Sequence, residues 1–285
     1  MGTKIPILIL NGLTQGALFF VLGSGLTLAF GLMKVVNLSH GAFYLLGGYI
    51  GFSVLNASGN WALALAAGAT SIGFFGFVFE RTMLFRVWGD LPQTLLTIAL
   101  SMIIADVSLA IWGGHPLTLN VPKFMNPSLT VFGITYPGFR YILMLTSVLI
   151  ASFLWIILYR TKFGAAVRAS VDDRETVSAL GVRIDVIYTL MFMLSALLAG
   201  LAGVLGGTYL QLSPGEDTTI LTYSLVVIIL GGMGSLPGAV VSSLILGQIL
   251  SFGLAYAPEI SMFLVFVPMA IVLAVRPQGL FGREA

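Results

Sequence analysis

The sequence predicts an all-α, polytopic integral membrane protein, and three observations carry this prediction. Of the 285 residues, 58% are hydrophobic and only 8% are charged, and the mean hydropathy is +1.04. A soluble domain has about 25% charged residues, so this chain cannot cover a water-facing surface. Apolar runs of about 20 residues recur along it, which is the length of membrane helices rather than of short barrel strands.

We expect these apolar runs to form about eight or nine transmembrane helices within a single membrane domain spanning residues 1–285. They lie at 7–32, 40–57, 61–79, 92–112, 139–159, 185–210, 219–233, 236–256 and 259–275. The span 219–233 is shorter than the roughly 20 residues of an ordinary crossing. It is flanked by SPGEDTT and GGMGSLPG. We therefore interpret this span as a broken or re-entrant helix.

The positions of Lys and Arg predict the orientation, because cytoplasmic loops are enriched in these residues. Five of the thirteen lie in the loop at about 160–184, which we therefore place in the cytoplasm. Arg81 and Arg86 mark a second inner loop, and Arg276 and Arg283 place the C-terminus inside. The N-terminus is then expected outside, and opposite termini require an odd number of crossings.

The longest outer loop is expected at about 113–138. It carries four prolines and is predicted to form an ordered cap of turns. Lys4 lies on the side that the charge rule disfavours. The extramembrane loops are short, and we expect no attached soluble domain.

The stretch NLSHGAFYLLGGYIG, residues 37–51, places polar residues at the head of an apolar run. Asn37 or Ser39 is expected to cap a helix that begins near His40. Small residues allow another backbone to approach this helix; they include Gly41, Gly47 and Gly48. The stretch is either a broken helix whose polar end faces a central pathway, or a capped helix end at the interface with an inert, water-exposed His40.

The most polar stretch is FGAAVRASVDDRETVSALGVRID, residues 163–185. Arg168, Asp172 and Glu175 have the spacing of one helical face, with opposite charges along it. Gly164 opens the stretch, and Gly181 closes it as a C′ glycine. We predict one short amphipathic cytoplasmic helix. It is either a solvated loop helix or the surface on which a partner protein docks.

The third unusual stretch is ILGGMGSLPGAV, residues 229–240. Its glycines, which include Gly231, Gly232 and Gly234, and its proline cannot continue a membrane helix. The stretch is either a tight interfacial turn or irregular backbone beside a cavity. The two glycine-broken stretches are also compatible with related halves of a transporter.

Asp106 is the one acidic residue inside a predicted span. Ionisable residues within membrane segments are functional candidates by default. Asp106 lies only about two turns from the outer end of its span, so the alternative is a carboxylate that reaches outer water. Gln15 in the first span is a milder case of the same kind.

Several chemistries find no support in the sequence. No GxxxxGK[ST] motif is present, so no P-loop is expected. The chain has two histidines and no cysteine, which leaves no credible metal site. No Ser-His-acid arrangement, arginine ladder or K⁺-channel filter is found. We therefore expect no enzyme activity and no cofactor in this chain.

The three stretches, together with the tail RPQGLFGRE, resemble the permease subunits of branched-chain amino acid ABC importers, of the LivH type. The resemblance covers nearly the whole chain in order, although Ser39 departs from the family's usual NLAHG or NFAHG. It implies a translocation pathway for which the candidates are Gln15, Asn37, Ser39, His40, Gly41, Gly47, Gly48, Asp106, Gly231, Gly232 and Gly234. It also implies a coupling segment that docks on an ATPase, for which the candidates are Gly164, Arg168, Asp172, Asp173, Arg174, Ala179, Leu180 and Gly181.

The resemblance also implies the partners and the location. They are a second, longer permease of the LivM type, two cytoplasmic ATPases that bind ATP and Mg²⁺, and a periplasmic substrate-binding protein at a bacterial inner membrane. No nucleic acid partner is expected. Branched-chain or related amino acids are the implied solutes, and urea, short amides or aromatic acids are the alternatives within the family. A stand-alone channel or secondary transporter is the alternative of another class, and only Asp106 offers it a coupling residue.

Overall fold

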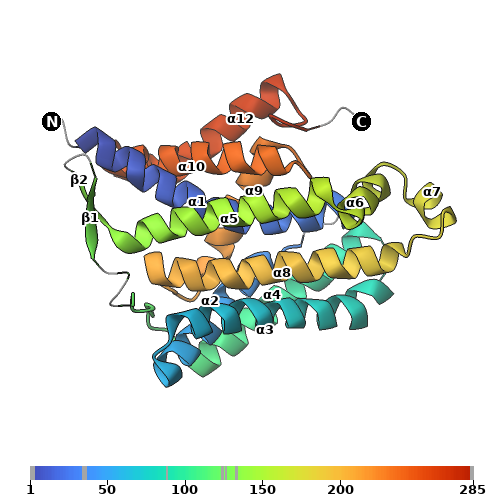
Figure 1. The fold of residues 1–285 in the computed structure, drawn as a ribbon, viewed down its shortest axis with the longest axis horizontal. Helices are drawn as coiled ribbons and strands as arrows, with labels where there is room; N and C mark the ends of the chain where they lie inside the picture. The colour runs from blue at the N-terminus through green and yellow to red at the C-terminus, as the bar shows by residue number, and fades with distance from the viewer. Residues whose placement is uncertain are drawn as a thin grey trace.

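The computed structural model describes residues 4–33, 37–87, 89–122, 125, 127–131 and 134–282. The chain is an all-α membrane protein, as the sequence predicts (Figure 1). The helices in the first half are α1 (Lys4–Met33), α2 (His40–Ser58), α3 (Trp61–Thr82), the short 3₁₀ helix η1 (Leu84–Arg86), α4 (Asp90–Trp112) and α5 (Gly138–Arg160). Those in the second half are α6 (Lys162–Asp172), α7 (Arg174–Ala179), α8 (Ile184–Tyr209), α9 (Glu216–Gly231), α10 (Leu236–Tyr256), η3 (Pro258–Ile260), α11 (Ser261–Leu264) and α12 (Phe266–Val275).

All nine predicted spans are helical. Seven helices of the described chain are long and apolar enough to cross a membrane. α2 and α9 fall outside that set, with 19 and 16 residues. The last span, Pro258–Val275, is interrupted at Val265 between α11 and α12. Pro268 explains this break, because its ring nitrogen cannot donate to the carbonyl of Leu264.

The described part of the predicted outer loop, at 113–138, contains strands as well as turns. It contains a two-stranded antiparallel hairpin of β1 (Ser128–Val131) and β2 (Ile134–Pro137). An isolated bridge between Leu117 and Leu212 ties the loop to the segment after α8. This last contact depends on a partner far away in the sequence, so the local composition of the loop does not predict it.

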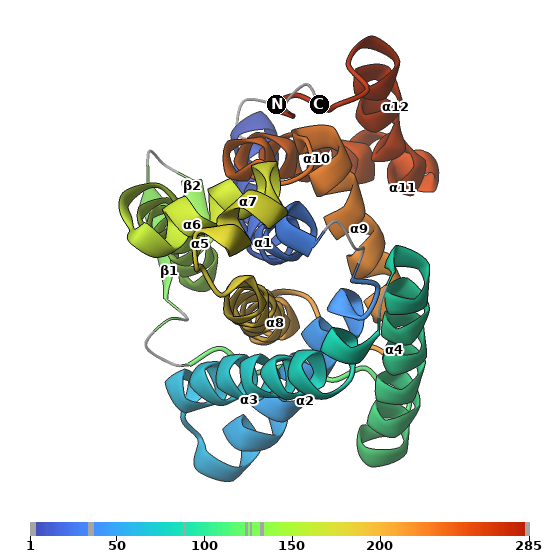
Figure 2. The ribbon, with the colours of Figure 1, turned by 90° about the vertical axis from the view of Figure 1, so that its right-hand side faces the viewer.

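Two antiparallel pairings organise the bundle: α1 packs along α10, and α3 packs along α8. α8 lies in the middle of the bundle, between α1 and α5 on one side and α2 and α3 on the other (Figure 2). The pairing of the first helix with the tenth mirrors that of the third with the eighth. The arrangement therefore relates α1–α3 to α8–α10, in line with the related halves that the sequence suggested.

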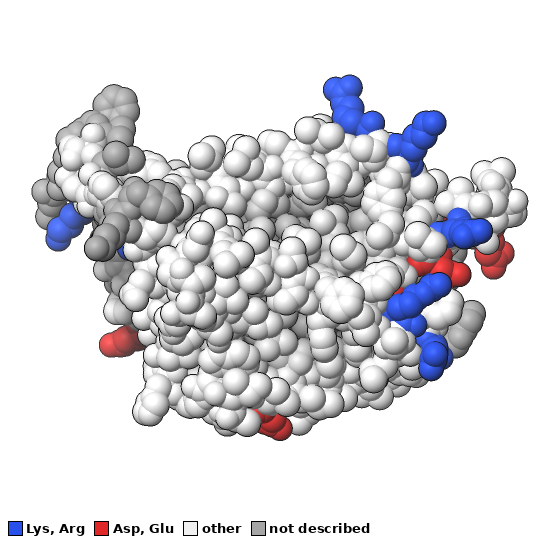
Figure 3. Space-filling view, turned by 60° about the horizontal axis from the view of Figure 1, so that its bottom comes forward, with Lys and Arg blue, Asp and Glu red and all other residues white. Residues whose placement is uncertain are grey.

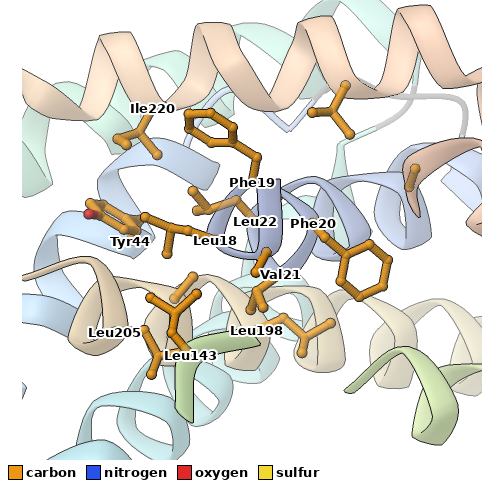
Figure 4. Close-up of a cluster of buried hydrophobic side chains, with 14 of the residues drawn as sticks. Leu18, Phe19, Phe20, Val21, Leu22, Tyr44, Leu143, Leu198, Leu205 and Ile220 are labelled. Carbon is orange, nitrogen blue, oxygen red and sulfur yellow. The ribbon is translucent and has the colours of Figure 1, made fainter. Parts of the chain in front are cut away.

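The core is built around one segment of α1. Leu18, Phe19 and Leu22 are buried and point toward residues of α2, α8 and α9, among them Tyr44, Leu205 and Ile220 (Figure 4). Lipid is as apolar as these side chains, so van der Waals packing and close helix approach hold such a bundle together. This packing fixes the position of α2 and α9 against α1.

The first and last segments of the described chain lie at opposite ends of the bundle (Figure 1). The charged side chains also separate: most Lys and Arg gather around α6, α7 and the neighbouring helix ends (Figure 3). Opposite ends for the termini are what an odd number of crossings requires. Which end faces outside stays a prediction.

Candidate functional site

α2 begins deep inside the bundle, at His40. The side chain of His40 is 0% exposed, and its Nε2 lies 2.9 Å from the carbonyl oxygen of Leu22 in α1. Leu22 is about 16 Å along the helix axis from Met33, the last residue of α1. The backbone N–H of Leu38 donates to Thr97 Oγ1 of α4, at 3.2 Å. α2 therefore begins near the middle of the bundle, and the chain returns inward to reach it.

Asn37 organises the turn before α2. Its Oδ1 accepts hydrogen bonds from the backbone N–H of Ser39 at 3.1 Å and from Ser39 Oγ at 2.6 Å. The helix begins at the predicted residue and Ser39 occupies the N-cap position as predicted, but no side chain bonds a helix N–H there. The alternative of a water-exposed His40 is wrong, because this side chain is buried. His40 Nδ1 and Asn37 Nδ2 are buried without a protein partner, so this turn holds unused polar capacity.

The first turn of α2 meets the first turn of α9. A Cβ atom at Gly41 would lie 2.0 Å from the carbonyl oxygen of Asp217, so only glycine fits. The other end of α9 leads to Gly234, which packs on Gly31 near the end of α1. The N-termini of two short helices thus converge at mid-depth, and helix N-termini carry partial positive charge. Transporters place solute contacts at such broken helices.

Gly47 and Gly48 form the crossing of α2 over α8. A Cβ at Gly47 would lie 2.4 Å from the Cα of Gly200, and one at Gly48 would lie 2.9 Å from the carbonyl oxygen of Gly203. Gly68 of α3 joins this junction, with its Cβ position 2.7 Å from the carbonyl oxygen of Gly47. Gly47 and Gly48 therefore pack against the backbone of α8 in the same chain.

The second glycine stretch forms the hairpin between α9 and α10. Gly232 and Gly234 have φ of +98° and +77°, which favour glycine. The C-terminal tail covers the end of α9: the N–H groups of Leu280 and Phe281 donate to the carbonyls of Leu230 and Gly231, at 2.9 and 3.0 Å. The hairpin lies at the opposite end of α9 from Gly41. The structure thus places the two breaks apart and joins them through α9.

The predicted single cytoplasmic helix is two helices. α6 ends at Asp172, Asp173 is extended with φ −148° and ψ 99°, and α7 follows. Asp173 caps α7 by accepting from the backbone N–H of Thr176, at 3.0 Å. The side chain of Thr176 donates to the same carboxylate. A shared face of Arg168, Asp172 and Glu175 is therefore wrong, because the break changes the helix direction.

Other parts of this prediction agree with the structure. Gly181 closes α7 with φ +85°. A Cβ at Gly164 would lie 2.3 Å from the carbonyl oxygen of Leu158, so glycine allows the tight turn from α5 into α6. The guanidinium of Arg168 stacks 5.3 Å from the ring centre of Tyr159. Leu180 is 78% exposed. The side chains of Asp172 and Arg174 lie outside the described set, and Ala179 is exposed.

Asp106 and Gln15 are in different surroundings. Asp106 lies on the exposed face of α4, so the structure does not bring it to the centre. Gln15 lines a pocket at the end of the bundle opposite α6 and α7, together with Arg140. The sequence analysis did not name Arg140 as a candidate. The feature that could have indicated it is a single arginine at the start of the predicted span 139–159.

Comparison with known proteins gives consistent matches. The family described as "Branched-chain amino acid transport system / permease component" matches residues 8–273. The high-affinity branched-chain amino acid transport system permease protein BraD of Pseudomonas aeruginosa is 28% identical over 292 residues, covering 96% of this chain and 95% of the relative. The corresponding LivH of Escherichia coli (strain K12) is 28% identical over 291 residues, covering 96% and 94%. LivM of Salmonella typhimurium is 28% identical over 298 residues, covering 94% and 68%.

Proposed function

This chain belongs to the family of permease components of branched-chain amino acid transport systems, and on that premise we propose that it is the LivH-like membrane subunit of an ATP-driven importer. The solutes are branched-chain or related amino acids. The observation that carries the proposal is the family match over residues 8–273. The relatives named LivH and LivM support a pair of different permeases in one system.

The distribution of charge supports an orientation. Arg81, Arg86, Arg160 and Lys162 lie at helix ends or loops on the side of α6 and α7, where most of the described cations gather (Figure 3). Positive charge marks the cytoplasmic side. The N-terminus of α1 then faces the periplasm, and the C-terminus faces the cytoplasm of a bacterial cell.

The segment α6–α7 is the surface we assign to the partner ATPase. It projects beyond the membrane helices (Figure 1). It combines charged residues with the exposed apolar side chains of Val171 and Leu180, at 37% and 78% exposure. Gly164 packs the start of α6 closely against the end of α5, so a displacement of α6 also displaces the membrane helix α5. The ATPases supply the P-loop that this chain lacks.

We assign the pathway to the N-terminal ends of α2 and α9, which meet inside the bundle. The buried turn 37–41 offers unpartnered polar atoms of Asn37 and His40, and the first turn of α9 lies against it. Weak, transient contacts suffice for a permease, so a mostly apolar route with few charges is adequate. A periplasmic binding protein then selects the solute.

The test is reconstitution in proteoliposomes with the companion permease, candidate ATPases and the binding protein. We expect leucine uptake that requires ATP hydrolysis, and co-purification of ATPase with the permease pair. Labelled urea and phenylalanine, used in parallel, test the alternative solutes. Uptake that follows an ion gradient, or that this chain supports alone without ATP, would place it with secondary transporters or channels instead.

A further inference from the structure

A polar pocket of about 350 Å³ opens at the end of the bundle opposite α6 and α7. Its polar lining comes from four helices of the two halves, and its apolar wall comes from α1 and α10. The lining residues are Leu8, Asn11, Gln15, Arg140, Tyr209, Ser251, Leu254 and Ala255. Small-molecule sites begin at about 300 Å³, so the pocket suits a solute of amino acid size.

Arg140 is held in this pocket by neutral groups. Its Nη1 donates to Asn11 Oδ1, and it lies 3.4 Å from the hydroxyl of Tyr136. The guanidinium carbon stacks 5.1 Å from the ring centre of Tyr136 and 5.3 Å from that of Tyr209. No Asp or Glu of the described chain forms an ion pair with it. The rings and the amide orient the cation and leave its charge unneutralised, as a site for an external anion requires.

Gln15 lines the same pocket. Leu8, Asn11 and Gln15 share one face of α1, at the i, i+3 and i+7 spacing of a helix. The pocket thus presents a donor-rich cation beside the apolar side chains of Leu8, Leu254 and Ala255.

We propose that this pocket binds the carboxylate end of an α-amino acid before it enters the pathway. The carboxylate pairs with Arg140, and the aliphatic side chain lies against Leu8 and Leu254. The substrate class rests on the proposed function. An anionic lipid shares the anion chemistry of this site, and an exchange of lipids in the test distinguishes it from the solute.

The test measures equilibrium binding of labelled leucine to the purified permease–ATPase complex without the binding protein, because the binding protein would otherwise set the affinity that is measured. Arg140→Gln is expected to raise the Kd for leucine by about tenfold to a hundredfold, the worth of a charge-assisted pair. Arg140→Lys is expected to retain part of the affinity. Arg86→Gln at the opposite end is the matched control and is expected to keep the wild-type Kd. The melting temperature of each purified variant identifies a folding defect.

Leucine analogues test the carboxylate contact. Leucinamide lacks the carboxylate, so its competition is expected to be weak and equal for wild type and Arg140→Gln. The deaminated acid, 4-methylpentanoate, keeps the carboxylate, so its competition is expected to weaken in Arg140→Gln. An unchanged Kd in folded Arg140→Gln, or absence of leucine binding by the wild-type complex, overturns the pocket while leaving the proposed function standing. An Arg140 effect that disappears when phosphatidylcholine replaces anionic lipid also overturns it. Absence of leucine uptake by the wild-type full importer refutes the proposed function instead.

Discussion

The Nε2 atom of His40 lies 2.9 Å from the carbonyl oxygen of Leu22, in the middle of α1. This contact fixes the depth at which α2 begins, because His40 is the first residue of α2 and Leu22 lies in the middle of α1. Lipid cannot satisfy the backbone groups of the turn before α2, so protein or cavity water must. Asn37 and Thr97 do this in part. The turn is therefore an interior feature of the fold that holds polar atoms without a protein partner.

Access to this turn can be tested with cysteines, since the natural chain has none. Ser39 is 0% exposed, so Ser39→Cys is expected to resist small water-soluble thiol reagents in the resting transporter. It is expected to react during ATP-driven turnover, when the pathway opens. The exposed residue Ser58 gives the control, because Ser58→Cys should react equally in both conditions. Labelling of Ser39→Cys that is the same with and without ATP would remove the turn from the pathway.

The glycine junction between α2 and α8 should not accept a methyl group. A Cβ at Gly47 would lie 2.4 Å from the Cα of Gly200, so Gly47→Ala and Gly200→Ala are each expected to destabilise the protein by about 1–3 kcal/mol. Leucine at either position is expected to prevent folding. Gly114→Ala is the control, because its Cβ would meet nothing closer than 3.8 Å. Thermal unfolding of the detergent-purified variants measures the difference, and equal melting temperatures would contradict the packing role.

Leu180 is expected to contribute to ATPase docking, since it is 78% exposed on the projecting segment. Leu180→Asp removes an apolar contact and places a charge in it, so it should reduce both co-purification of the ATPase and stimulated ATP hydrolysis several-fold. The control is Thr82→Ala, an exposed change at the last residue of α3. Normal assembly and hydrolysis in Leu180→Asp would show that the partner docks elsewhere.

Asp173 links the order of α7 to pH. Hydrogen bonds from the Thr176 side chain and backbone lower the pKa of the Asp173 carboxyl below its ordinary value of 3.8. A carboxyl whose pKa is lower in the folded than in the unfolded state stabilises the folded state at any pH above the pKa of the unfolded state. This stabilisation is lost as the pH falls through the pKa of the folded state. Amide exchange in α7 is therefore expected to show constant protection from pH 8 to about 5 and to lose it only in stronger acid.

Two variants of Asp173 complete this test. Asp173→Ala removes the cap, so α7 amides should exchange faster than in the wild type from pH 8 to about 5. Asp173→Asn keeps a capping oxygen without the charge, so it should preserve most of the protection and remove the acid dependence. If Asp173→Ala exchanges like the wild type, the carboxylate does not cap α7 in solution.

The sequence by itself determined the membrane class, the helical spans and the polar segment at 163–185. These properties are local: an apolar run of sufficient length must become a helix in lipid, because only a helix satisfies its own backbone there. The starts of α2 and α10 at His40 and Leu236 were predicted for the same reason, from the polar and glycine residues that precede them. The family resemblance also needed only the ordered motifs.

The tertiary structure decided how deep each helix starts and which residues meet. The burial of His40, the Gly47–Gly200 contact and the convergence of α2 with α9 depend on the relative heights of separate helices, which no local pattern records. The break at Asp173 follows from a local cap that competed with a helix of good spacing. Arg140 and Asn11 are 129 residues apart in the chain. Packing alone brought them together, because helix axes must be placed before their side chains can share a pocket.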